Sequence, residues 1–251
     1  MMRIYYKPIL YVMFLSQSIK IYSISLWDQV RFSALKVNKE YNISMGSGFF
    51  VNSHQIITNR HVVERCKNIA IRGAVSPNLA TLQLVDPKLD LALLYTTATP
   101  VKIPYLRINY QQMRQDDILF TVGYPLKNAE IGTYIIRQTS VLDVSTNPQS
   151  GFSNIRFTDV VDHGNSGGPL LDKNSNIVGV VTAKISYSKD VDSNIYKSEG
   201  LAIGLDGLIN FLKSNNIAFA SNATYDIFTN YNIDQTAKNY VVNIHCVQES
   251  E

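Results

Sequence analysis

Short runs of β-forming residues recur along most of the chain, and they constrain the fold more than any other feature. From about residue 40 onward, most of these runs are four to six residues long and rich in Val, Ile, Thr, Tyr and Phe, with Gly, Asn, Asp, Pro or Ser between them. They cover residues 48–51, 55–58, 68–71, 80–85, 91–95, 118–122, 133–138, 155–158 and 177–182. Regular short strands of this kind predict an all-β sandwich or barrel.

The series of strands is interrupted near its middle. Residues 100–115 contain Pro100, Pro104 and a polar run, and they form a candidate linker. The halves on either side fit two small barrels better than one continuous sandwich. We therefore predict an N-terminal β-barrel over residues 26–110 and a C-terminal β-barrel over residues 111–216.

The end of the second half has the one convincing helical pattern. Within residues 207–213, Leu208, Phe211 and Leu212 fall on one side of a helix, which predicts a short C-terminal helix that closes the barrel. Residues 217–251 are rich in Asn, Tyr and Thr and form a C-terminal extension. Whether this extension is packed or loose stays open.

The first 25 residues have the layout of a signal peptide. Arg3 and Lys7 form a positively charged n-region, residues 9–15 form an apolar h-region, and small residues at 16–18 or 22–25 offer a cleavage point. The apolar run is too short to span a bilayer, which takes about 20 residues. We therefore predict an exported protein, periplasmic or secreted, with no stable membrane anchor after signal removal. A buried N-terminal strand is the competing interpretation.

The charge balance argues against nucleic acid as a partner. The chain has 23 Lys and Arg against 20 Asp and Glu, and three of the basic residues lie in the first 25 positions, where no acidic residue occurs. The remainder is balanced, with 20 against 20. A nucleic-acid-binding protein normally gathers a basic surplus, because phosphate contacts supply most of its affinity.

The cysteines allow one disulfide. Cys66 and Cys246 could pair in an exported protein and hold the C-terminal segment near the N-terminal half, or they could be two isolated buried thiols. Neither lies in a Cys-x-x-Cys motif, and the histidines are scattered at His54, His61, His163 and His245. The sequence therefore predicts no metal site and no cofactor.

Ser166 is the strongest candidate for a catalytic residue. It lies in Gly-Asn-Ser-Gly-Gly-Pro-Leu, residues 164–170, where flanking glycines let the backbone approach a substrate carbonyl. The amides of Gly164 and Ser166, with Asn165 between them, can point into one oxyanion hole, where one donor is typically worth about 100- to 1,000-fold in rate. The alternative is a glycine-rich hairpin loop.

Acyl transfer by a serine also needs a base and a carboxylate that orients the base. His61 lies where the run at residues 55–58 ends and a short turn or helix begins, which exposes a side chain at the rim of a barrel. Asp90 directly precedes the apolar run at residues 91–95, where its carboxylate can fix an imidazole tautomer. Either residue alone is more often structural, but the order His, Asp, Ser strengthens all three assignments.

Six segments together resemble the trypsin-like peptidases, and in particular the protease domain of the HtrA/DegP group. They are residues 46–51, 57–63, 90–94, 164–172, 177–181 and 200–204, and the resemblance covers roughly residues 40–215. It implies two six-stranded antiparallel β-barrels with the active site between them. It also implies that His61 is the base, Asp90 its orienting carboxylate and Ser166 the nucleophile, acting on protein or peptide substrates.

The chain departs from the family pattern in three places. The HtrA group usually carries a C-terminal PDZ domain, and the residues after Asn216 are too few for one, so an oligomer is possible but regulated assembly is in doubt. His163 replaces a common Pro and is either a substrate contact or an exposed loop residue. Asn165 replaces the Asp that digestive trypsins pair with a new N-terminus, which predicts an enzyme that is active once folded and exported.

The resemblance also implies a substrate pocket with an apolar lining. It predicts cleavage after small or medium apolar residues, although Asp162 turned inward would favour a basic residue. The predicted pocket residues are Val160, Val161, Asp162, His163, Leu201, Ala202 and Ile203.

Two other functions compete with a trypsin-like peptidase. Residues 164–168 also satisfy the Gly-x-Ser-x-Gly elbow of α/β-hydrolases, and His245 follows it, but that fold continues from the serine into a helix, whereas here a β-run follows. The second alternative is a catalytically inactive relative that keeps the barrels to bind peptides or partner proteins. Nothing in the sequence favours it, because every triad position is intact.

Overall fold

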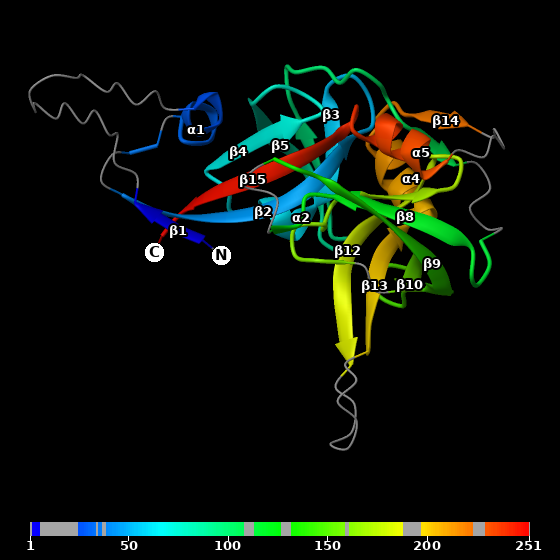
Figure 1. Cartoon of the computed structure of the whole chain (residues 1–251). Coiled ribbons are helices and arrows are strands. Elements are labelled where there is room, and N and C mark those ends of the chain that lie inside the picture. Colours follow the sequence, from blue (N-terminus) through cyan, green and yellow to red (C-terminus); the bar gives the residue numbers. More distant parts are fainter. Residues whose placement is uncertain are drawn as a thin grey trace, which may run out of the picture.

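The chain folds into two β-barrels that lie side by side, shown in Figure 1. The computed structural model describes residues 2–5, 25–33, 35–36, 39–107, 113–126, 132–158, 161–187, 197–222 and 229–250. Each barrel is a closed ring of six strands, and every neighbouring pair within a ring is antiparallel. The predicted fold class is therefore confirmed.

The first barrel carries the strands around His61 and Asp90. In ring order its strands are β2 (Glu40–Phe50), β15 (Val241–Glu249), β4 (Asn68–Gly73), β5 (Asn78–Asp86), β6 (Leu91–Tyr95) and β3 (Gln55–Asn59). Pairing between β2 and β3 closes the ring. A further strand, β1 (Met2–Tyr5), pairs with the start of β2 outside the ring.

The second barrel carries the serine loop. In ring order its strands are β11 (Pro169–Asp172), β8 (Ile118–Gly123), β9 (Ile135–Thr146), β10 (Ser153–Thr158), β13 (Lys197–Gly204) and β12 (Ile177–Tyr187). Pairing between β11 and β12 closes this ring. Two short strands, β7 (Tyr105–Arg107) and β14 (Ala220–Asn222), add to it in parallel.

Four short helices accompany the barrels in the described residues. They are α1 (Leu26–Arg31), α2 (Arg60–Val63), α4 (Leu205–Ser214) and α5 (Asn230–Ala237). The helix predicted at residues 207–213 lies within α4, and its apolar side is buried in the large core shared by both barrels. None of the helices in the described part of the chain is long and apolar enough to cross a membrane.

The C-terminal strand β15 is one of the six strands of the first barrel and lies between β2 and β4 (Figure 1). The sequence predicts only an extension over residues 217–251, packed or loose. Residues 241–247 are buried, and the strand pairs with β2 from Val241 opposite Phe49 to Glu249 opposite Tyr41. A strand buried between two neighbours satisfies its backbone N–H and C=O groups on both edges, so the last part of the chain is a structural member of this barrel.

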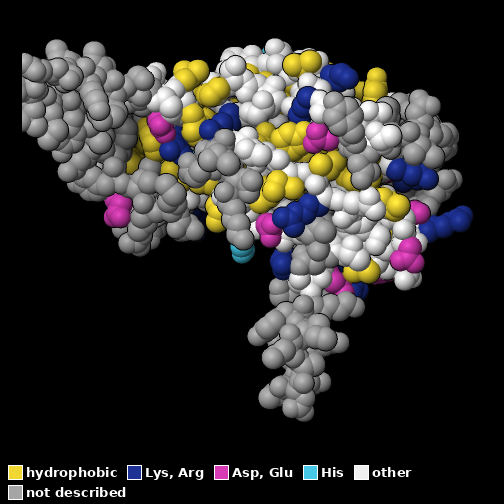
Figure 2. All heavy atoms as spheres, viewed as in Figure 1, with side chains coloured by type: hydrophobic (Ala, Val, Ile, Leu, Met, Phe, Trp, Pro, Cys, Tyr) yellow, Lys and Arg dark blue, Asp and Glu magenta, His cyan; other side chains and the backbone are white. Residues whose placement is uncertain are grey.

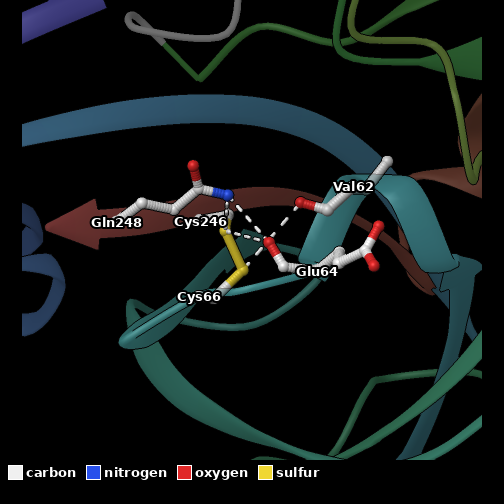
Figure 3. Close-up of a disulfide and its surroundings, with 5 residues drawn as sticks. All are labelled: Val62, Glu64, Cys66, Cys246 and Gln248. Atoms are coloured by element: carbon white, nitrogen blue, oxygen red, sulfur yellow. Dashed lines mark hydrogen bonds between the residues drawn. A yellow bond between two sulfur atoms is a disulfide. The ribbon is translucent and has the colours of Figure 1, made fainter. Parts of the chain in front are cut away.

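A disulfide fixes β15 to the segment that follows α2. Figure 3 shows Cys246 of β15 joined to Cys66, with a Cα–Cα distance of 5.1 Å. Beside it, Gln248 Nε2 donates a hydrogen bond to the carbonyl of Glu64 at 2.8 Å. Of the two states that the sequence leaves open for the cysteines, the structure contains the disulfide.

The N-terminal segment is described only at its start. Residues 2–5 form β1, with Met2 opposite Ile43 and Tyr5 opposite Glu40. The predicted h-region at residues 9–15 and the cleavage points up to residue 24 lie outside the described residues. The description resumes at Ser25, whose side chain caps α1.

Candidate active site

His61 and Asp90 lie together at one end of the first barrel. Asn59 ends β3 and occupies the N-cap position of α2, and this places His61 at the second position of that single turn of helix. The imidazole Nδ1 lies 2.6 Å from Asp90 Oδ2, and the backbone N–H of His61 donates to Asp90 Oδ1 at 3.1 Å. Because a carboxylate only accepts, the proton of a neutral imidazole lies on Nδ1 in this contact, which leaves the lone pair of Nε2 free.

The backbone of Asp90 is held in an unusual conformation. Its φ is +54°, in the left-handed region that Asp tolerates better than most residues. Its carbonyl accepts hydrogen bonds from Arg60 N at 3.0 Å and from Asn59 Nδ2 at 3.1 Å. These bonds fix the turn before β6 and aim the carboxylate at the imidazole.

Thr182 on β12 connects Asp90 with Ser166. Its Oγ1 donates to Asp90 Oδ2 at 3.0 Å, and its carbonyl accepts from Ser166 Oγ at 3.2 Å. The serine hydroxyl makes no hydrogen bond to His61 within the described residues. It therefore has to leave the Thr182 carbonyl before the imidazole can take its proton. Loose catalytic hydrogen bonds are common in structures without substrate.

Two glycines let the serine loop pass between the barrels. Gly164 has φ +100° and Gly167 has φ +85°, in the region that favours glycine. A Cβ at Gly164 would come within 2.3 Å of the Tyr124 carbonyl oxygen, and one at Gly167 within 2.2 Å of the Ser47 carbonyl oxygen. Any side chain at either position would displace the loop from one barrel or the other.

The amides expected to form the oxyanion hole are available. Neither the N–H of Gly164 nor that of Ser166 donates a hydrogen bond within the described part of the chain, whereas the N–H of Asn165 donates to Asp162 O at 3.1 Å. The Asn165 side chain is buried. Two neighbouring backbone donors without a partner, next to a serine hydroxyl, form an arrangement that can accept a developing oxyanion.

The residues predicted to line the pocket take three kinds of position. Val161, Ala202 and Ile203 are buried in hydrophobic clusters, Leu201 and Asp162 are half-buried and His163 is exposed, while Val160 lies outside the described residues. The Asp162 carboxylate pairs with Arg137 Nη2 of β9 at 3.1 Å. An Asp162 carboxylate turned into the pocket would favour a basic substrate residue. Here the carboxylate already has a cationic partner in Arg137.

Sequence reasoning missed two residues that touch the site. Thr182 ends an apolar run at residues 177–182 and has the pattern of an ordinary strand residue. Ser47 lies between two glycines in residues 46–48, a pattern that contributes to the resemblance without indicating a role for its hydroxyl. In the structure Ser47 N donates to Ser166 O at 2.8 Å. Only the contacts between barrels reveal either residue.

The fold and the site together place the protein in a class: two antiparallel β-barrels with a His-Asp-Ser arrangement where they meet. Residues 46–180 match the family model described as the trypsin-like peptidase domain. The chain belongs to this family.

Curated relatives and a solved structure are consistent with this membership. The chain is 28% identical to "Uncharacterized protein y4bJ" of Sinorhizobium fredii over 81% of its own length and 32% of that protein. It is 34% identical to "Probable periplasmic serine endoprotease DegP-like" of Bartonella henselae over 58% of the chain and 29% of that protein. It thus spans about a third of the length of these relatives.

The structure resembles the active form of the Rv3671c protease from Mycobacterium tuberculosis with a TM-score of 0.56. The similarity covers 70% of this chain and 76% of that one at 20% sequence identity. At this level of identity the comparison supports the fold alone.

Proposed function

We propose that the protein is a serine endopeptidase that hydrolyses peptide bonds through an acyl-enzyme on Ser166. The observation that carries this proposal is the 2.6 Å contact between His61 Nδ1 and Asp90 Oδ2, linked through Thr182 to the Ser166 hydroxyl. Family membership supports it independently. A carboxylate fixed on Nδ1 holds the imidazole in the tautomer that a general base requires.

The residues act in a defined order in the proposed reaction. Ser166 Oγ attacks the carbonyl carbon of the substrate while His61 Nε2 takes the hydroxyl proton, and Asp90 stabilises the imidazolium that forms. The amides of Gly164 and Ser166 bind the oxyanion. His61 then gives its proton to the departing amine as the C–N bond breaks. In the second half, water attacks the ester with His61 again as base, which releases the acid and restores Ser166.

We further propose cleavage after small or medium apolar residues. Val161 and Ala202 share a hydrophobic cluster with Phe157, and a Cβ at Gly200 would come within 2.2 Å of the Phe157 ring. The nearby Asp162 carboxylate pairs with Arg137. Apolar neighbours and a carboxylate that already has a cationic partner favour an apolar side chain over a basic one.

Export and peptide substrates complete the proposal. The Cys66–Cys246 disulfide is typical of an oxidising compartment, and the Bartonella henselae relative is named as periplasmic. On the face shown in Figure 2, the positively and negatively charged side chains of the described residues are interspersed, which fits a protein substrate better than nucleic acid.

The test is digestion of a diverse peptide library, with the cut sites read by mass spectrometry. Wild type is expected to cut mainly after Val, Ala, Ile or Leu, and the Ser166→Ala variant is expected to leave the library intact. Dominant cleavage after Lys, Arg or Glu would contradict the apolar pocket. Equal cleavage by wild type and Ser166→Ala would contradict the serine mechanism and favour the inactive, peptide-binding alternative.

A further inference from the structure

Ser47 on β2 is fully buried between the two barrels, with 0% of its surface exposed. Its hydroxyl donates a hydrogen bond to the Gly164 carbonyl at 2.7 Å and accepts one from Tyr124 N at 2.8 Å. Its backbone N–H donates to the Ser166 carbonyl at 2.8 Å, and its own carbonyl accepts from Thr58 Oγ1 at 2.7 Å. The hydroxyl, the backbone N–H and the backbone carbonyl of this serine therefore all have partners.

Two of these bonds hold the peptide groups that frame the proposed oxyanion hole. The bond from Ser47 Oγ fixes the peptide unit between Gly164 and Asn165, and the bond from Ser47 N fixes the one that follows Ser166. Because the amide N–H of a trans peptide points opposite to its C=O, holding the Gly164 carbonyl also sends the Asn165 N–H away, towards Asp162 O. The amides of Gly164 and Ser166, on either side of that peptide unit, stay without a partner.

The rest of the loop is held by its own barrel. The carbonyl of His163 accepts from Leu126 N at 2.6 Å, and that of Asn165 accepts from Gly168 N at 3.0 Å. The four carbonyls from residue 163 to residue 166 thus all have partners, and two of the four partners are groups of Ser47. Within the described residues, both hydrogen bonds that the first barrel makes to these carbonyls come from Ser47.

Packing makes the arrangement sensitive to the Ser47 hydroxyl. A Cβ at Gly123 would come within 2.8 Å of Ser47 Oγ, and one at Gly168 within 3.3 Å of Ser47 Cβ. Removal of the hydroxyl would leave a buried acceptor at Gly164 and a buried donor at Tyr124 without their partner, and both would be driven to find another. The acceptor at Gly164 belongs to the loop that carries the two oxyanion amides, so a shift of this carbonyl would displace them.

From this geometry we infer that Ser47 is the positioning residue of the oxyanion hole. It touches neither the substrate nor the reacting atoms. It acts by holding the carbonyls of Gly164 and Ser166, whose peptide units adjoin those that carry the two oxyanion amides, so that both amides face the developing charge. The inference rests on the proposed peptidase function. Such a residue affects the transition state more than substrate binding, because the oxyanion exists only once the carbonyl has been attacked.

The test compares Ser47→Ala with wild type on the best peptide from the library screen. We expect kcat to fall by about 10- to 100-fold with KM unchanged, since a misplacement of about 1 Å can cost on the order of 100-fold. The affinity for the matching peptide aldehyde, whose adduct puts an oxygen in the oxyanion hole, should fall by a similar factor. The affinity for the product peptide, which makes no adduct, should stay the same.

Two further variants keep this test decisive. Ser44→Ala removes a hydroxyl from the same strand that has no partner within the described residues, and it should leave kcat and aldehyde affinity at wild-type values. Ser47→Cys keeps the shape and a weak donor, and its kcat should lie between those of wild type and Ser47→Ala. If Ser47→Ala does not fold, a reduced kcat at unchanged KM in Ser47→Cys supports the inference, and a wild-type kcat overturns it.

The outcomes separate this inference from the function on which it rests. A folded Ser47→Ala variant with wild-type kcat, or with equal losses of aldehyde and product affinity, overturns the inference while the peptidase stands. A wild-type protein without Ser166-dependent hydrolysis overturns both.

Discussion

Thr182 is the residue through which the two halves of the site meet. Its hydroxyl donates to Asp90 Oδ2, the same oxygen that contacts His61 Nδ1, and its carbonyl holds the Ser166 hydroxyl. A carboxylate that accepts two hydrogen bonds on one oxygen is fixed in orientation, and the orientation of Asp90 determines that of the imidazole. The residue lies on the second barrel, whereas Asp90 and His61 lie on the first.

Removal of the Thr182 hydroxyl should weaken catalysis without unfolding the protein. Thr182→Val keeps the branched shape and loses the bond to Asp90 Oδ2. A hydrogen bond to a charged group is worth about 1.5–3 kcal/mol, so we expect kcat/KM to fall by roughly 10- to 100-fold. Steady-state hydrolysis of a library-derived peptide measures this.

Thr182→Ser is the matched control, because it retains the hydroxyl. It should keep most of the wild-type kcat/KM, and equal losses in Thr182→Ser and Thr182→Val would show that the methyl group matters and the hydrogen bond to Asp90 does not.

Among the elements, β15 differs most from its sequence-based description as an extension. It pairs along β2 on one edge and β4 on the other, and the disulfide anchors it beside α2, the turn that carries His61 (Figure 3). Residues 241–247 are Val, Ile and other strand formers, so the element itself follows from β propensity. Its partners do not, because β2 lies almost 200 positions earlier, and local patterns carry no information on such pairings.

Loss of the disulfide should destabilise the protein measurably. The bond closes a loop of 180 residues in sequence, and removal of a native disulfide typically costs about 2–5 kcal/mol, chiefly through the freedom gained by the unfolded chain. We expect the double variant Cys66→Ala/Cys246→Ala to have a free energy of unfolding lower by that amount, and therefore a lower urea midpoint.

The reduced wild-type protein provides the control for this experiment. It should have the same urea midpoint as the double variant, and the midpoint of the double variant should not change when reductant is added. Identical urea midpoints for oxidised wild type and the double variant would contradict a stabilising role for the Cys66–Cys246 bond.

The end of β15 should make a small pH-dependent contribution to stability. Hydrogen bonds and ion pairs with Lys39 and Lys67 lower the pKa of Glu249 from its usual range to about 2. A carboxyl whose pKa is lower in the folded state stabilises fully above its unfolded pKa, and this stability is lost as pH falls towards about 2. Wild type should therefore exceed Glu249→Gln in urea midpoint at pH 7, and the gap should shrink at pH 3.

Salt provides an independent check on the same pair of proteins. The gap at pH 7 should narrow in 1 M NaCl, because exposed ion pairs are screened. A gap that grows on acidification would contradict the assignment of these ion pairs.

At the scale of the whole molecule, the site exists only because two barrels meet. The first supplies His61 and Asp90, the second supplies Ser166, and Ser47 and Thr182 each bond across the boundary. The cores are also joined, since residues of both barrels and of α4 share one hydrophobic cluster. Because β15 is one of the strands of the first barrel, this arrangement also depends on residues 241–249.

Much of this architecture could be predicted from the sequence, and the limits have physical causes. Short runs separated by turn residues predict the strands, and the order His61, Asp90, Ser166 predicts which residues to bring together. Ser47 and Thr182 could not be predicted, because a hydroxyl within a strand shows no function until its partner across the barrels is known. The ion pair of Asp162 with Arg137 is likewise a contact between separate segments.

The central claim is that Ser166 is a nucleophile activated by His61, and labelling with a fluorophosphonate followed by mass spectrometry tests it most directly. We predict one covalent adduct on Ser166 of the folded wild-type protein, a greatly slowed reaction in His61→Ala and no adduct in Ser166→Ala. A folded wild-type protein that forms no adduct at Ser166, or a His61→Ala variant labelled as fast as wild type, would contradict the account.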